Sequence, residues 1–173
     1  AELWRSRGVE PAALMGHSLG EYTAAHLAGV FSLDDALRIV GVRGEVFERM
    51  PAGAMLSVAL SEDDVRPLLP PEVSLAAVNG PELCVLSGPV AALTAVEQTM
   101  AARGVEAKRL HIDVAAHSAM LEPFLEEFRR RIADVAYHLP TRPLVSNVTG
   151  TWAAEDVANA EYWTRHLRAC VRF

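Results

Sequence analysis

Residues 54–113 alternate between short apolar runs and helical patterns, and this order constrains the fold more than any other feature. Runs typical of strands cover 54–60, 73–79, 83–88 and 105–113, and helical patterns cover 61–69 and 89–104. The resulting order is βαββαβ, which is the ferredoxin-like, split-βαβ pattern. We therefore predict a small ferredoxin-like subdomain over residues 53–114.

Further helical and apolar patterns flank this unit on both sides. They are a strand at 12–15, a helix at 20–30, a helix that begins at Ser32, an amphipathic helix at 117–135, a strand within 140–150 and a helix at 159–169. We expect them to form an α/β body of residues 1–52 and 115–173, which the small subdomain interrupts.

Composition narrows the class of protein. The chain has 173 residues, of which 51% are hydrophobic, enough for one domain with an insert. A net charge of −6 argues against nucleic acid as the main partner. With no run of 18 apolar residues, no signal peptide and two distant cysteines, we expect a cytoplasmic protein without membrane span, disulfide or metal site. Both ends look like cuts through a longer polypeptide.

The stretch GHSLG, residues 16–20, fits the G-x-S-x-G pattern of a serine nucleophile. Its predicted context is a strand, a tight turn with Ser18 at the tip, and a helix. The first amides of that helix, Leu19 included, would then face a developing oxyanion. The alternatives are a chance match and an ordinary serine N-cap.

A nucleophilic serine needs a base, and the chain has six histidines. We favour His117, because it follows the last strand of the small subdomain and precedes a helix, where the chain re-enters the body. His17 is adjacent to Ser18, but neighbouring side chains on such a turn point apart. The alternative is that His117 is only a polar helix entry.

Arg43 borders the apolar face of the helix that begins at Ser32. A guanidinium in such a place needs an anion, because an unpaired buried charge is costly. The partner could be a substrate carboxylate that is gripped by two parallel hydrogen bonds. An internal salt bridge to Glu45 or Glu48, or extension of the side chain into solvent, is the alternative.

These residues carry a family resemblance. The segment GHSLGEYTAAHLAGVFSLDDALRIVGVRG resembles the nucleophile region of the malonyl-CoA:acyl-carrier-protein transacylase family, and most of all the acyltransferase domains of modular type I polyketide synthases. The stretches AAVNGPELCVLSGP, VAAHSAMLEPF, PLVSNVTG and YWTRHLRACVRF resemble later blocks of these domains in the same order. The resemblance covers essentially the whole chain, which would be truncated at both ends.

The resemblance implies an α/β-hydrolase-like catalytic body with the ferredoxin-like insert. It also implies roles: Ser18 is the acylated nucleophile, His117 the base and later the acid, Arg43 the ligand of a malonyl-type carboxylate, and Leu19 an oxyanion amide. The backbone near His166 would orient the catalytic imidazole. Substrate-binding positions implied in the same way are His17, Val114, Ala115 and Ala116.

The implied reactants are an acyl-CoA donor and the phosphopantetheine thiol of an acyl carrier protein, with neighbouring synthase domains as partners and no bound cofactor. The four residues VAAH, 114–117, match neither His-Ala-Phe-His of malonyl users nor Tyr-Ala-Ser-His of methylmalonyl users, whereas Leu19 favours malonyl. Cys170 replaces a usual proline. The family's Gly-Gln-Gly-type loop, which completes the oxyanion hole, is absent, so we expect this chain alone to be poorly active.

Two other functions remain open from the sequence. A serine hydrolase, such as a thioesterase, would share Ser18 and His117 and need a carboxylate, for which Asp113 is the nearest candidate. A scaffold that keeps the fold without turnover is the other possibility. Arg43 distinguishes the transferase from a plain esterase, which has no need of it.

Overall fold

The structure, a computed structural model, describes the backbone of residues 1–173 and all side chains except that of residue 2. Its helices are α1 (Glu2–Arg5), α2 (Leu19–Leu27), α3 (Leu33–Arg49), α4 (Glu62–Val65), α5 (Val90–Ala102), α6 (Leu125–Ile132) and α7 (Ala160–Arg168). Its strands are β1 (Gly53–Val58), β2 (Ser74–Gly80), β3 (Leu83–Pro89), β4 (Ala107–Arg109) and β5 (Val171–Arg172).

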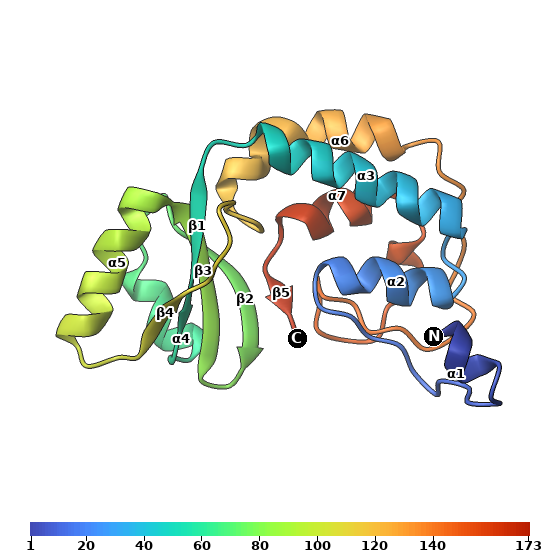
Figure 1. The fold of residues 1–173 in the computed structure, drawn as a ribbon, viewed down its shortest axis with the longest axis horizontal. Coiled ribbons are helices and arrows are strands. Elements are labelled where there is room, and N and C mark those ends of the chain that lie inside the picture. The colour runs from blue at the N-terminus through green and yellow to red at the C-terminus, as the bar shows by residue number, and fades with distance from the viewer.

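The five strands form one sheet in the order β4-β1-β3-β2-β5. Strands β1 to β4 pair antiparallel, whereas β5 runs parallel to β2. From β1 to β4 the elements follow the βαββαβ order that the sequence predicts. Helices α4 and α5 lie together on one side of this sheet, at the left of Figure 1.

Alternation along the strands gives the sheet two apolar faces. On the face toward α5, Leu56 and Leu86 pack with Leu93, Val96 and Met100. The opposite face buries a smaller cluster, made of Met55, Ala76, Ala77, Val85 and Val171. Because Val171 comes from the last residues of the chain, the C-terminus is fixed to this second face.

Helices α2, α3, α6 and α7 enclose a second, larger core. Its fully buried side chains include Tyr22, Ile39, Phe128 and Trp163, and Figure 1 shows α3 and α6 side by side. Helix α3 begins as predicted: the Ser32 hydroxyl accepts the N–H of Asp35 at 3.0 Å. The division of the chain into residues 1–52 with 115–173 and residues 53–114 stays a prediction, and β5 is an addition to the sheet that the sequence did not predict.

Two predicted strands of the body are not strands in this structure. Residues 12–15 and 140–150 form only isolated bridges, between Leu14 and Leu144 and between Val145 and Trp152. The helix predicted over 117–135 begins with a 3₁₀ segment, Ala119–Phe124, because Pro123 inside it has no N–H to donate. Short 3₁₀ turns also occur at Arg66–Leu68 and Glu155–Val157. Among the described residues, no helix is both long and apolar enough to cross a membrane.

Candidate active site

Ser18 occupies a strained turn immediately before α2. Its φ of 49° and ψ of −109° are unusual for a residue with a side chain. A Cβ at Gly16 would lie 2.1 Å from the carbonyl carbon of Gly20, so only glycine fits at this turn. The sequence pattern G-x-S-x-G thus has a direct steric reason here.

The Ser18 hydroxyl lies against the imidazole of His117, with 2.6 Å between Oγ and Nε2. Nδ1 of His117 lies 2.9 Å from the carbonyl oxygen of Ala169, which can only accept, so Nδ1 carries the proton and Nε2 is free to accept from Ser18. His117 also has a positive φ, 54°; among the described non-glycine residues, only Ser18 and His117 do.

The group that orients His117 lies in the backbone near His166, the region that the resemblance implies. It is the carbonyl of Ala169, three residues after His166 and one residue beyond the end of α7. The side chain of His166 itself lies behind the site, with Nε2 3.0 Å from Oε2 of Glu21. A carbonyl at a helix end can orient the ring because the last carbonyls of a helix lack intrahelical donors.

His117 is held in the neutral form. Burial lowers its pKa to about 3, and electrostatic interactions with His166 and Arg43 act in the same direction. At neutral pH the imidazole is therefore unprotonated at Nε2, as a general base for Ser18 must be.

Arg43 reaches the same hydroxyl from α3. Its Nη2 donates to Oγ of Ser18 at 2.9 Å, and the residue is only 7% exposed. Its Nε and Nη1 are buried without a hydrogen-bond partner among the described residues. The guanidinium carbon lies 5.7 Å from the ring centroid of Tyr22 and 5.0 Å from that of Phe47. Burial lowers the pKa of the Arg43 guanidinium.

The internal salt bridge considered for Arg43 is not present in the described part of the chain. Glu45 binds Arg131 instead, and no carboxylate is paired with Arg43. Two of its nitrogens thus remain available beside the serine, in a place where an anion is required to offset the buried charge.

A buried polar cluster behind Ser18 was missed from the sequence. Oδ1 of Asn147 accepts the backbone N–H of Ser18 at 2.7 Å, and the N–H of Asn147 donates to Oε2 of Glu21 at 2.9 Å. The hydroxyl of Tyr162 donates to Oε1 of Glu21. No sequence motif signals this cluster, because its members are brought together only by the fold.

The remaining predicted residues are placed as follows. Leu19 is the first residue of α2, where a helix leaves its N–H groups unpaired. Nε2 of His17 lies 2.8 Å from Oδ1 of Asn79 in β2, so His17 connects the nucleophile turn to the sheet. Val114 is half-buried, Ala115 is buried against Gly53, and Ala116 packs against the smaller apolar face of the sheet.

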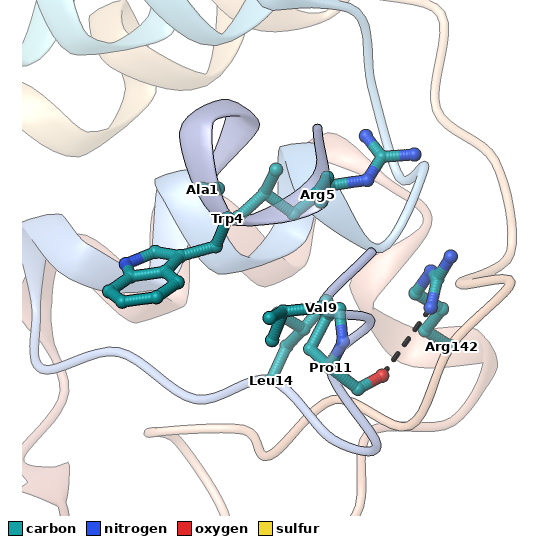
Figure 2. Close-up of a pocket in the computed structure, with 8 residues that line it drawn as sticks. Ala1, Trp4, Arg5, Val9, Pro11, Leu14 and Arg142 are labelled. Atoms are coloured by element: carbon teal, nitrogen blue, oxygen red, sulfur yellow. Dashed lines mark hydrogen bonds between the residues drawn. The ribbon is translucent and has the colours of Figure 1, made fainter. Parts of the chain in front are cut away.

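Asp113, the carboxylate considered for a hydrolase, is exposed, and its backbone carbonyl accepts the N–H of Gly53. Among the described residues no three His, Cys, Asp or Glu side chains gather to hold a metal ion. A separate apolar hollow of about 480 Å³ lies at the N-terminal segment, where Trp4, Val9 and Leu14 line it (Figure 2). None of the site residues above lines that hollow.

Comparisons with known proteins identify the family of the chain. Residues 1–173 match the family described as "Acyl transferase domain". The chain is 46% identical over 169 residues to the mycoketide-CoA synthase of Mycobacterium tuberculosis, covering 97% of this chain and 4% of that synthase. It is 44% identical to the polyketide synthase GfsA of Streptomyces halstedii, covering 99% of this chain and 2% of GfsA.

Solved structures give the same result. The acyltransferase domain from the second module of the salinomycin polyketide synthase superposes with a TM-score of 0.94 at 46% identity, covering 99% of this chain and 41% of that one. The SpnD acyl transferase domain, in complex with 2-(pent-4-yn-1-yl)malonyl, has a TM-score of 0.95 at 42% identity, covering 100% of this chain and 42% of that one.

The mixed α/β chain therefore belongs to the acyl transferase domain family. Within that family it is an acyltransferase domain of the kind found in modular type I polyketide synthases. It spans less than half of the two solved chains named above and 2–4% of the two curated synthases named above.

Proposed function

We propose that the chain transfers an α-carboxyacyl unit from CoA to a carrier-protein thiol through an acyl-serine. Nε2 of His117 takes the proton of Ser18 as Oγ attacks the thioester carbonyl. The developing oxyanion accepts the N–H of Leu19 at the start of α2. The C–S bond then breaks, His117 returns the proton to the CoA sulfur, and the acyl group remains on Ser18.

The second half of the reaction repeats these steps with another thiol. The phosphopantetheine thiol of an acyl carrier protein gives its proton to His117 and attacks the acyl-serine, and Ser18 is regenerated as the ester bond breaks. The curated relatives are polyketide synthases, which supports a carrier protein and neighbouring synthase domains as partners. In the complete domain we propose an α/β-hydrolase-like body around the helices α2, α3, α6 and α7.

The observation that carries this proposal is the unpaired guanidinium beside the serine. Nη2 of Arg43 lies 2.9 Å from Oγ of Ser18, while its Nε and Nη1 have no partner among the described residues. A carboxylate on the acyl group would bind one edge of this guanidinium, Nε with Nη2 or Nη1 with Nη2, in the bidentate geometry that arginine favours. The malonyl derivative in the SpnD complex belongs to the same chemical class.

The acyl group that we propose is malonyl or a related malonyl-type unit. Leu19 favours malonyl by resemblance, whereas Ala116 is small and lies at the apolar face of the sheet, where an α-substituent would find space. A single methyl group is worth only about 1–3 kcal/mol of discrimination in such a pocket, so the preference is open to small changes in packing.

Intact-mass spectrometry after incubation with malonyl-CoA tests the proposal. We expect a malonyl adduct on wild type and none on Ser18→Ala, and we expect the adduct to disappear when a phosphopantetheinylated carrier protein is added. Acetyl-CoA and methylmalonyl-CoA in parallel samples report the acyl preference. Release of CoA without any adduct would favour a hydrolase, and neither adduct nor release would favour a scaffold.

A further inference from the structure

Ser18 is held by a side chain that belongs to neither the nucleophile turn nor the base. Asn147 lies 129 positions further along the chain and is 1% exposed. Its Oδ1 accepts the backbone N–H of Ser18 at 2.7 Å. A donor N–H requires an oxygen at this position, so the contact fixes the orientation of the Asn147 amide.

The contact matters because the backbone of Ser18 is strained. A non-glycine residue at a positive φ costs on the order of 1–3 kcal/mol and persists only when its surroundings impose it. The backbone of this turn is also held by hydrogen bonds from the N–H groups of Gly20 and Glu21 to the carbonyls of His17 and Ser18. None of these bonds involves the N–H of Ser18, so loss of the Asn147 contact would leave this amide without its partner and the strained backbone, which carries Oγ, less constrained.

Asn147 is itself held in place by a buried carboxylate. Its N–H donates to Oε2 of Glu21 at 2.9 Å, and Glu21 is completely buried. Glu21 lies three residues after Ser18 in the first turn of α2, so the carboxylate fastens Asn147 to the same turn that its side chain grips. The carbonyl of Asn147 also accepts the N–H of Arg172 in β5 at 2.8 Å.

Tyr162 holds Glu21 in turn. Its hydroxyl donates to Oε1 and lies 2.7 Å from Oγ of Ser146. Nε2 of His166 lies 3.0 Å from Oε2, but neither ring nitrogen of His166 has a hydrogen-bond partner among the described residues. The hydrogen-bonded part of this buried cluster, from Tyr162 through Glu21 to Asn147, lies behind the nucleophile and restrains its turn.

One atom of Asn147 takes no part. Its Nδ2 is buried without a hydrogen-bond partner among the described residues, so only the carbonyl half of the amide is used. A side chain of equal size that keeps an oxygen acceptor should therefore replace asparagine, whereas an equally large apolar one should not.

We propose that Asn147 is a positioning residue for the nucleophile: its side-chain oxygen holds the Ser18 amide, and thereby aims Oγ at Nε2 of His117. Asn147 contacts neither reacting atom, and the proposal rests on the proposed role of Ser18 as the acylated nucleophile.

The test compares Asn147→Leu, which removes the acceptor, with Asn147→Asp, which keeps it. Ser61→Ala is the matched control, because Ser61 also accepts a backbone N–H, that of Asp64, but at the start of α4. Two readouts are the rate at which a fluorophosphonate probe labels Ser18 and the hydrogen exchange of the Ser18 amide. Thermal unfolding shows that each variant is folded.

We expect Asn147→Leu to slow labelling by about 10- to 100-fold and to expose the Ser18 amide to exchange, because a buried donor loses its partner. Ser61→Ala should keep both values close to wild type. Asn147→Asp should keep the Ser18 amide protected, because it retains the oxygen acceptor, and should label faster than Asn147→Leu. Labelling of folded Asn147→Leu at the wild-type rate would overturn the proposal. So would equal slowing of both Asn147 variants with the amide still protected.

Two measurements on the wild type keep the proposal open to refutation even if Asn147→Leu does not fold. Fast exchange of the Ser18 amide would show that Asn147 does not hold it, and the proposal would fail while the proposed function stood. A protected amide with no labelling of Ser18 would instead contradict the proposed function, and the positioning role would fall with it.

Discussion

Nη2 of Arg43 lies 2.9 Å from Oγ of Ser18, so one buried cation touches the atom that we propose as nucleophile. A positive charge at this distance favours the alkoxide that forms as His117 removes the proton. The other two guanidinium nitrogens, Nε and Nη1, are buried without partners among the described residues. In the proposed reaction, activation of the serine and recognition of a carboxylate would therefore depend on a single side chain.

Substitution of Arg43 should slow the loading of acyl groups that carry a carboxylate but not of neutral acyl groups. We expect Arg43→Ala to lower kcat/KM for malonyl loading by about 100-fold or more, because two charge-assisted hydrogen bonds of about 1.5–3 kcal/mol each are lost. Acetyl loading should be spared or improved, since acetyl carries no carboxylate. Loading rates measured by mass spectrometry check this.

Arg38 is the control for that experiment. It lies on the same helix but is exposed and pairs with Asp134, away from the serine. Arg38→Ala should leave both loading rates unchanged. Unchanged malonyl loading in Arg43→Ala would mean that this arginine does not bind the carboxylate.

The low pKa of His117, about 3, should shift the acidic limb of the pH–rate profile to lower pH. A base that is neutral above that value stays active as the pH falls through the ordinary histidine range. We expect kcat/KM for loading to remain level from pH 8 down to about 5. A half-maximal rate near pH 6.5 would show that His117 titrates as an exposed histidine does.

The same group affects stability. Unfolding returns the His117 pKa from about 3 to its ordinary value of 6.5, so between these values the unfolded chain binds a proton that the folded chain does not. The contribution of neutral His117 to the free energy of unfolding is complete above pH 6.5. It is lost as the pH falls toward 3, at no more than about 1.4 kcal/mol per pH unit. Urea unfolding across this window should show a shallower pH dependence in His117→Gln than in wild type.

Gly16 and Gly20 flank the serine but should respond in opposite ways to alanine. At Gly16 a Cβ would overlap the backbone of Gly20 at 2.1 Å, and we expect Gly16→Ala to cost about 3 kcal/mol or more. A Cβ at Gly20 meets nothing within 4 Å, and alanine favours the helix there by about 0.5–1 kcal/mol. Denaturant midpoints of the two variants decide the point; equal midpoints would contradict the steric argument.

Glu62 fastens the end of the chain to the small sheet. It binds Arg172 of β5 and Arg66, and these arginines hold its carboxyl pKa at about 2. Because the pair is partly exposed, we expect Glu62→Ala to cost only about 1 kcal/mol at pH 7. The cost should vanish as the pH falls from 4.5 toward 2, where the carboxylate of the wild type becomes protonated.

Glu126→Ala provides the comparison, because the Glu126–Arg129 pair is more exposed and joins residues of the same helix. Its cost at pH 7 should be smaller than that of Glu62→Ala. If both variants lose the same stability in urea unfolding, the attachment of β5 through Glu62 contributes nothing beyond an ordinary surface ion pair.

Local signals predicted those parts of the fold that local physics determines. The capping serine of α3 and the alternation in β1 to β3 depend on residues a few positions apart, and the structure contains both. The strands expected at 12–15 and 140–150 were wrong, because a strand depends on pairing with distant residues and not on its own sequence alone. These two segments form only isolated bridges, and so they are not strands.

The site divides in the same way. Ser18 stands out through its glycines, His117 through its place after the small subdomain, and Arg43 through its apolar helix face. The Ala169 acceptor could not be recognised from its side chain, because a backbone carbonyl is the same in every residue. Asn147 was missed because its role depends on a contact 129 positions away, and no pattern near it points to Ser18.

The last five residues of the chain contact both the candidate site and the sheet. The carbonyl of Ala169 aligns His117, and after one further residue β5 joins the sheet beside β2. A stretch this short has no slack, so a shift of the sheet against the helices would pull on the imidazole within a few bonds. A displacement of β5 would thus change the distance from the Ala169 carbonyl to Nδ1 of His117, which couples the edge of the sheet to the position of the imidazole.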